Sequence, residues 1–420
     1  MQVFKFGGAS LRNEQAVRNM AAIVKRYGRQ PLVVVVSAMG KTTRHLEAYI
    51  EARVHGLDAD KVLQEIKDYH QQIMQGLFGK RHEIFTEVEQ CFDQLTDVVW
   101  DNTHFERFAD RVVATGELVS SAIVTAFLQE QGLRAVRVLA PELIKCDDHF
   151  GNGHVQWEET SALIQQKVRP LLEEQIVVAQ GYIGSSASGD IITLGKEGSD
   201  YTAAIFAACL DAGKVTIWKD VQGILTADPK LIPDARFIEQ LSYPEASEMT
   251  YYGASVIHPK TIKPLANRNI PLFVRSFDNP ELPPTCIIGT GQDDTLPAYI
   301  LKKNQCLFTF RVRDYTFVDE ASLALIFSTL HRLDISINLL QSSAITISVC
   351  FDHRQEHIEE LLQTLKDSFS MHYMTGLDLI TLKNYTEEFL KKHRPQQEVI
   401  LAQQSRKNYR FLVKGSPAAN

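Results

Sequence analysis

The sequence predicts an α/β protein with a mainly parallel sheet in its first large part and small α/β modules in its tail. Residues 32–37, LVVVVS, form an almost unbroken β-branched run, which is typical of a strand covered on both faces. Strand-like segments alternate with helical patterns up to about 276. From about 299 onward the order becomes βαββαβ, with a paired β segment in its middle.

The first part opens with a strand, a glycine turn and a helix. VFKF at 3–6 is strand-like, Gly7 and Gly8 interrupt it, and the apolar residues of 13–27 share one helical face. Residues 44–131 hold several helical patterns and few strand signals, so we expect a helical insertion there. Further strand-like segments are 135–139, 176–184, 190–195, 214–220 and 271–276.

The tail is expected to hold two related modules, at about 304–375 and 376–414. Residues near 297–303 would complete the second module. The segment 279–297 is rich in proline, glycine and acidic residues and reads as a connector. We therefore predict domains at 1–290 and 296–420.

Composition excludes several classes of protein. The 420 residues are 45% hydrophobic and 23% charged, and the formal net charge of -7 argues against a nucleic-acid binder. The six cysteines are scattered without a CxxC pair or a histidine cluster at metal spacing, so no zinc site or disulfide framework is expected. Without a secretory signal or a long apolar run, we expect a cytoplasmic protein that does not contact a membrane.

The turn KFGGAS is a candidate anion site. Lys5 precedes two glycines and Ser10 follows them, so a permissive backbone could turn its amides toward a phosphate that Lys5 also contacts. The alternative is a strand end with a surface lysine.

The segment SAMGKTT, 37–43, resembles the end of a P-loop, but valine occupies position 35, where that motif requires glycine. The hydroxyls of Ser37, Thr42 and Thr43 could bind a ligand at the carboxyl end of a strand, or the threonines could simply cap the next helix.

The segment GDIITLGKEGSDYTAA, from 189, joins a strand-like run to a helix that begins near Tyr201. Ser199 or Asp200 could only cap that helix. However, Lys196 lies between two glycines just upstream, and a cation beside a helix N-terminus suits a carboxylate or phosphate. Asp200 would instead attract a cation or an ammonium group.

Other charged residues are ambiguous by themselves. Glu117 in ATGELVSS could be a first-turn acid favoured by the helix dipole. The loop KDVQGILTADPK, 219–230, could be only a turn. Lys260 and Lys263 add basic charge, while His258 is expected to be packed or to cap a helix.

These segments, in this order, resemble the aspartokinases of the amino-acid kinase superfamily over residues 2 to about 290. The matching pieces are KFGGAS, VVSAMGKTT, ATGELVSS, AQGYIG, TLGKEGSDYTAA, IWKDVQGILTADPK and YYGASVIHPKTI. The tail is similar to the paired ACT domains of that family, to about 414. The resemblance implies an αβα sandwich that transfers the γ-phosphoryl of Mg-ATP to the β-carboxylate of L-aspartate, the first step of lysine, threonine and methionine biosynthesis.

The resemblance also implies roles for single residues. Lys5, Asp200 and Lys196 would be catalytic, Glu117 would receive the substrate ammonium, and Lys196 would hold the α-carboxylate. Further substrate-binding residues would be Ser37, Thr42 and Ser199. The implied ATP-binding residues are Lys5, Gly7, Gly8, Ser10, Lys219, Asp220, Leu225, Asp228, Lys230 and Lys260. Mg²⁺ would accompany ATP, and we predict no metal ligands in the protein.

The chain departs from the family at several positions. Lys196 replaces an arginine and should hold a carboxylate less firmly, because an ammonium lacks the planar fork of a guanidinium. Ser255 stands where many members have a nucleotide-contacting lysine, and we expect Lys260 or Lys263 to take over part of that contact. The other departures are Ala9 for threonine, Glu197 for glycine and Lys230 for arginine.

The tail departs too. Asn338 and Ala344 replace two acids, while Ser342 and Ser343 keep their hydroxyls. We expect Asn338, Ser342 and Ser343 to contact an amino-acid effector, lysine or threonine, and lysine inhibition to be altered or weak. Alternatively the tail serves only association, and we expect a homo-oligomer of even number.

Two other functions stay open. One is a different kinase of the superfamily, which phosphorylates another carboxylate or a related acceptor. The other is a catalytically silent amino-acid sensor, which the replacements at Lys196 and Ser255 would favour.

Overall fold

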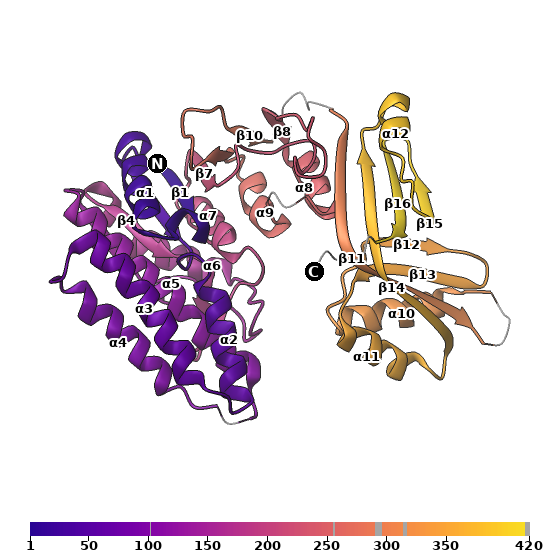
Figure 1. Cartoon of the computed structure of the whole chain (residues 1–420), viewed down its shortest axis with the longest axis horizontal. Helices are drawn as coiled ribbons and strands as arrows, with labels where there is room; N and C mark the ends of the chain where they lie inside the picture. The colour runs from indigo at the N-terminus through magenta and orange to yellow at the C-terminus, as the bar shows by residue number, and fades with distance from the viewer. Residues whose placement is uncertain (101, 255–256, 290–295, 314–316, 416–420) are drawn as a thin grey trace. The chain divides into compact units, whose positions relative to one another are not determined.

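A computed structural model of the chain describes residues 1–100, 102–254, 257–289, 296–313 and 317–415. The chain divides into two compact units (Figure 1). The first comprises Met1–Ile224, Phe237–Ser247 and the described part of 256–294. The second comprises Leu225–Arg236 and the described parts of 248–255 and 295–420.

The first unit is built on a mainly parallel sheet, as the sequence predicts. Its described strands follow the spatial order β3-β4-β2-β1-β7-β9-β10-β8, and only β9 and β10 are antiparallel neighbours. The strands are β1 Gln2–Phe6, β2 Leu32–Val36, β3 Ala135–Val138, β4 Ile176–Gln180, β7 Lys214–Lys219, β8 Gln240–Ser242, β9 Leu272–Ser276 and β10 Thr285–Ile288. A small antiparallel pair, β5 Ile183–Ser185 and β6 Ile191–Thr193, lies outside this sheet.

Helices cover both faces of this sheet because successive side chains of its buried strands point to opposite sides. Phe4 and Phe6 join a hydrophobic core with α1 to α5, whereas Lys5 on the same strand faces α7. The helices are α1 Glu14–Tyr27, α2 Thr42–Val54, α3 Ala59–Phe78, α4 Ile84–Thr96, α5 Phe105–Glu130, α6 Trp157–Lys167, α7 Gly198–Cys209, α8 Tyr243–Tyr252 and α9 Pro259–Asn267. Short 3-10 turns are η1 Gly8–Leu11, η2 Ala140–Glu142 and η3 Leu171–Glu173.

Helices α2 to α5 occupy the segment where a helical insertion is predicted (Figure 1). Helix α5 is long and apolar enough to cross a membrane by length and composition, but 83% of its most apolar window is buried in the unit. Its apolar residues therefore serve the core.

The second unit is an antiparallel sheet with helices. Its described strands follow the order β12-β13-β11-β14-β16-β15. The strands are β11 Ala298–Val312, β12 Leu339–Ser342, β13 Thr346–Asp352, β14 Phe369–Lys383, β15 Val399–Gln404 and β16 Asn408–Lys414, and the helices are α10 Glu320–Arg332, α11 Gln355–Leu365 and α12 Glu387–His393.

Two long strands run through the second unit, where the sequence pattern predicts separate shorter ones. β11 and β14 have 15 residues each and pair along almost their whole length. The register shifts between Lys302 and Leu307, and the left-handed residues Asn304 and Gly376 lie at this irregularity. The β11–β14 pair continues through this bulge into both halves of the sheet. The two predicted modules therefore share β11 and β14 as their central strands.

Candidate active site

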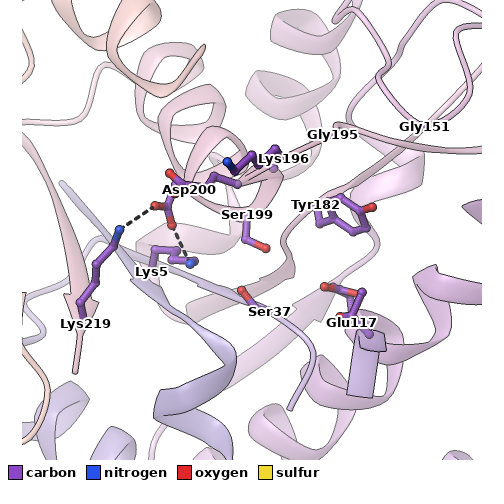
Figure 2. Close-up of a pocket in the computed structure, with 13 residues that line it drawn as sticks. Lys5, Ser37, Glu117, Gly151, Tyr182, Gly195, Lys196, Ser199, Asp200 and Lys219 are labelled. Atoms are coloured by element: carbon purple, nitrogen blue, oxygen red, sulfur yellow. Dashed lines mark ion pairs between the residues drawn. The ribbon is translucent and has the colours of Figure 1, made fainter. Parts of the chain in front are cut away.

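A cavity of about 490 Å³ opens at the carboxyl ends of the parallel strands in the first unit (Figure 2). Ligand sites of open α/β sheets usually lie at this edge, because the loops that follow the strands converge there. The cavity is lined by Lys5, Ser37, Thr43, Glu117, Gly151, Tyr182, Gly195, Lys196, Glu197, Gly198, Ser199, Asp200 and Lys219.

Two lysines converge on one buried carboxylate. Nζ of Lys5 lies 2.6 Å from Oδ1 of Asp200, and Nζ of Lys219 lies 3.7 Å from Oδ2 (Figure 2). Burial opposes ionisation of Asp200, but the two lysines outweigh it and hold the pKa of this carboxyl below its usual range. Asp200 thus attracts cations, as its sequence context predicts, and the two ion pairs place two cations on the cavity wall.

The N-terminus of α7 forms one side of the cavity. The helix begins at Gly198, so Ser199 and Asp200 lie inside its first turn rather than before it. A Cβ on Gly198 would lie 2.7 Å from the Tyr182 ring, so this position requires glycine. Lys196 is exposed at the rim, and no ion pair among the described residues involves it.

Glu117 lies in the middle of the buried helix α5, so the interpretation of it as a first-turn acid is wrong. One carboxylate oxygen, Oε1, accepts a hydrogen bond of 3.1 Å from the Ala38 amide. The other, Oε2, is buried and has no partner among the described residues. Burial raises the pKa of Glu117 to about 8. This oxygen is available to a cationic group in the cavity.

Of the two threonines after β2, Thr43 and not Thr42 lines the cavity. Thr42 is buried, and its hydroxyl donates to the Met39 carbonyl at 2.6 Å and contacts Nε2 of His70 at 3.2 Å. Thr43 lines the cavity instead, beside Ser37. The prediction that Thr42 contacts substrate is therefore corrected to Thr43, because the first turn of α2 points Thr42 into the core.

The glycine turn after β1 packs beside Lys5. A Cβ on Gly7 would lie 3.5 Å from Nζ of Lys5, and a Cβ on Gly8 would lie 2.8 Å from the Ala38 and Gly40 carbonyls. Gly8 is required by this close approach to the β2 loop. Ser10 is buried, and Gly7, Gly8 and Ser10 are not among the residues that line the cavity.

Two cavity residues carry no sequence signal that singled them out. Tyr182 follows Gly181 with φ of 70°, a left-handed conformation that bulky residues rarely adopt. Burial raises its pKa to about 12. Gly151 belongs to the loop after β3, and its amide donates to Oδ2 of Asp110 at 2.8 Å.

With this geometry in view, similarity to known proteins decides the family. A model of the amino acid kinase family matches residues 1–276. Over 354 residues the chain is 32% identical to lysine-sensitive aspartokinase 3 of Escherichia coli, covering 83% of this chain and 78% of that relative. It is 30% identical to aspartokinase 1, chloroplastic, of Arabidopsis thaliana, covering 91% and 68%.

The chain belongs to the aspartokinases of the amino acid kinase family. The crystal structure of E. coli aspartokinase III in complex with aspartate and ADP superposes with a TM-score of 0.85 at 28% identity, covering 99% of this chain and 96% of that one. The same enzyme in complex with lysine and aspartate gives 0.76 over the same shares. The resemblance drawn from the sequence is confirmed, and this aspartokinase is a phosphotransferase.

Several residues predicted to bind ATP lie away from the cavity lining. Lys219 lines it, and Asp220 follows exposed at the end of β7. Leu225, Asp228 and Lys230 fall in the second unit of this aspartokinase, where the Lys230 amide donates to Oδ1 of Asp228 at 2.9 Å. Their role toward the nucleotide stays a prediction.

The lysines of the α9 segment also differ from expectation. Nζ of Lys260 donates to Oδ1 of Asn152 and, at 3.3 Å, to the Leu194 carbonyl, so the protein itself holds this ammonium. Lys263 is exposed. The His258 side chain accepts from the Lys260 amide and caps α9, as expected. The replaced position, Ser255, lies outside the described residues.

Asn338 in the second unit is fully engaged by the protein. Its Oδ1 accepts from Lys302 at 2.7 Å, and its Nδ2 donates to Gln305 at 2.7 Å and to Asp352 at 3.0 Å. The side chain is buried, so direct contact with an effector would require these bonds to break. Ser342 and Ser343 are exposed, and the Ser343 hydroxyl contacts that of Thr346.

Proposed function

We propose that this aspartokinase transfers the γ-phosphoryl group of Mg-ATP to the β-carboxylate of L-aspartate, giving 4-phospho-L-aspartate and ADP. The observation that carries the proposal is one cavity that holds both lysine cations and a buried carboxyl group. The Lys5–Asp200–Lys219 cluster supplies cations, and the buried Glu117 carboxyl supplies an oxygen without a partner among the described residues.

The substrate amino acid would be held at both of its charged ends. Its ammonium would pair with Oε2 of Glu117. This positive charge would lower the raised pKa of the Glu117 carboxyl and so favour its ionised form. Its α-carboxylate would meet the exposed ammonium of Lys196 and the hydroxyl of Ser199 at the N-terminus of α7. These contacts orient the β-carboxylate toward Lys5.

Phosphoryl transfer to a carboxylate needs no general base, because the nucleophile already carries its charge. Catalysis then depends on alignment and on neutralising the oxygens of the transferring group. Lys5 lies on a central strand and is held by Asp200, so its ammonium is preorganised for this task. Lys219 brings a second cation to the same place.

Asp200 and Glu117 do not fit a protein-held Mg²⁺ site. Both Asp200 oxygens face lysines, and Glu117 gives one oxygen to the Ala38 amide and is favoured in its neutral form by burial. A magnesium ion prefers several oxygen ligands and keeps waters, so it would arrive on the phosphates as part of the substrate Mg-ATP.

The test is acyl phosphate formation by the purified full chain with Mg-ATP, trapped with hydroxylamine. L-Aspartate is compared with L-glutamate and N-acetyl-L-glutamate at equal concentration, and ADP release is followed in parallel. We expect hydroxamate only with L-aspartate. Turnover confined to another acceptor would make the chain a different carboxylate kinase, and a folded protein without turnover would make it a silent sensor.

The second unit would provide amino-acid feedback on lysine, threonine and methionine biosynthesis. The lysine complex of E. coli aspartokinase III supports an amino-acid effector in this family. Here Asn338 is neutral and bonded to Lys302, so we expect a lysine ammonium to find little free negative charge and lysine inhibition to be weak. Strong inhibition by sub-millimolar lysine would refute this. The even homo-oligomer and the cytoplasmic location remain part of the proposal.

A further inference from the structure

The loop between β3 and α6 brings together three side chains that no sequence pattern connects. Asp147, His149 and His154 each offer a ligand atom, and these atoms lie within 4.8 Å of one another. The expectation of no histidine cluster at metal spacing is thereby corrected, since the loop folds back and closes the spacing. Both histidines are exposed.

We propose that Asp147, His149 and His154 bind a divalent transition-metal ion of the zinc class. This site is separate from the proposed phosphoryl transfer and does not depend on it. A surface ion pair between His154 and Asp147 is the alternative, and such pairs contribute at most about 1 kcal/mol to stability.

The distances suit a metal with little movement. Nδ1 of His154 lies 2.8 Å from Oδ2 of Asp147. Ligand atoms at about 2.0–2.2 Å from one tetrahedral zinc ion lie about 3.3–3.6 Å from each other, so an ion can replace the proton shared by this pair once the two atoms move apart by about half an ångström. The His149 ring centroid lies 5.4 Å from that of His154, and its ligand atom lies within 4.8 Å of the other two, so this exposed side chain would have to rotate to complete the set.

The carboxylate is oriented by the backbone. Oδ1 of Asp147 accepts from the His154 amide at 2.9 Å and from the His149 amide at 3.4 Å. These bonds leave Oδ2 directed at the imidazole of His154. In protein metal sites, hydrogen bonds of this kind hold a ligating side chain in the orientation that the metal requires.

The ligand set selects the class of metal. Two imidazoles and one carboxylate suit Zn²⁺, Ni²⁺ or Cu²⁺, whereas Mg²⁺ prefers oxygen ligands and gains little from imidazole. The exposed position leaves the remaining coordination sites to water. A magnesium ion that arrives with the nucleotide should therefore not compete.

The ion would act on the loop that borders the active cavity. Between the two histidines, Gly151 lines the cavity and donates to Asp110, and the Gly153 amide donates to the Thr193 carbonyl at 2.9 Å. Asn152 accepts from Lys260. A metal held by residues 147, 149 and 154 would link both ends of this loop and reduce its motion.

The experiment is calorimetric titration of the full chain with ZnCl₂, without nucleotide, in a buffer that does not chelate metals and contains excess MgCl₂. We expect one Zn²⁺ per chain. The variants His149→Ala, His154→Ala and the double variant should each weaken this binding by a factor of about ten or more. Because the affected side chains are exposed, the variants should fold, and circular dichroism checks this.

His55→Ala is the matched control. Nε2 of His55 lies 3.2 Å from Oε2 of Glu51, with comparable exposure, and no second imidazole joins this pair among the described residues. Zinc binding should be unchanged in this variant. Hydrogen exchange gives a second readout, because zinc should slow exchange of the 147–154 amides in the parent chain and in His55→Ala but not in the double variant.

Two results would overturn the proposal. One is a parent chain that takes up no zinc under these conditions. The other is an equal stoichiometry and affinity in the double variant, which would place the ion at cysteines or other histidines. Loss of binding in His55→Ala but not in the double variant would lead to the same rejection.

Discussion

The two units bury polar side chains in different ways. In the cavity of the first unit, Glu117 keeps one buried oxygen without a partner among the described residues, and burial raises its pKa to about 8. In the second unit, Asn338 uses both ends of its amide on Lys302, Gln305 and Asp352. Burial opposes ionisation of Asp352, but its hydrogen bonds and Lys302 keep the pKa of that carboxyl low.

This difference separates a site that awaits a ligand from one that is already satisfied. A buried polar atom without a partner costs about 1–3 kcal/mol, and a ligand that supplies the partner recovers it. A satisfied network gains nothing from a ligand and instead fixes the local structure. We therefore expect substitutions in the first unit to change kinetics and those around Asn338 to change stability.

The largest effect should come from Lys5→Met in the first unit. Removing this ammonium takes away a preorganised charge at the transferring phosphoryl group, so we expect kcat to fall by a factor of about 10² to 10³. Steady-state ADP release measures it. Because the substitution also leaves Asp200 with Lys219 alone, a folded fraction from circular dichroism must accompany the rate. A folded Lys5→Met chain with unchanged kcat would contradict the assignment.

Glu117→Gln should come next and should change substrate binding. Without the carboxylate, the aspartate ammonium loses a buried charged partner worth about 2 kcal/mol or more, so KM for aspartate should rise about 30-fold.

In the parent chain, kcat/KM for aspartate should change with pH in a direction that the pKa of Glu117 sets. Glu117 with a pKa of about 8 is neutral below that pH, and the carboxylate that pairs with an ammonium forms above it. We expect kcat/KM for aspartate to rise with pH up to about 8 and then level off. The effect of Glu117 on stability runs the other way. Its raised pKa contributes to the free energy of unfolding at pH below 4.5, and this contribution is lost as the pH rises to about 8. A flat profile in the parent would refute the role of Glu117.

Lys196→Arg tests whether the rim of the cavity can be improved. A guanidinium fork can bind the α-carboxylate in a bidentate way, so we expect KM for aspartate to fall about fivefold with kcat nearly unchanged. Lys61→Arg, at an exposed lysine of α3 in the same unit, is the control and should have no effect. An unchanged KM would mean that Lys196 does not contact the substrate carboxylate.

Asn338→Ala should have the smallest effect on catalysis and a clear effect on stability. It leaves Lys302, Gln305 and Asp352 without their shared partner, so we expect the second unit to lose about 1–3 kcal/mol in free energy of unfolding. Denaturant unfolding measures this, with Ser342→Ala at an exposed position as the control. A large change in kcat with unchanged stability would erase the contrast between the units.

The sequence could predict the parallel sheet because its strands are short, apolar runs that end in recognisable turns, such as VFKFGG and LVVVVS. It also placed Lys5, Ser37, Glu117, Lys196, Ser199, Asp200 and Lys219 among the functional candidates, and all of them line one cavity. Long motifs in a fixed order carried that information.

Other features depend on packing that a linear pattern does not contain. Thr42 and Thr43 are equivalent in sequence, and only the direction of the first turn of α2 decides which one is buried. The length of β11 and β14 was hidden by Asn304 and Gly376, which look like turn residues but lie at a bulge. Asp147 and the two histidines are brought together by a loop without regular periodicity.

The position of Lys5 also has a consequence in time. Its strand β1 is hydrogen-bonded to β2 on one side and β7 on the other, in the middle of the sheet. Amides in such a strand exchange with solvent only when the whole unit opens, because partial fraying starts at edges and loops. The Lys5 ammonium therefore moves away from the cavity only when the whole unit unfolds, and heating should abolish activity and sheet structure at the same temperature.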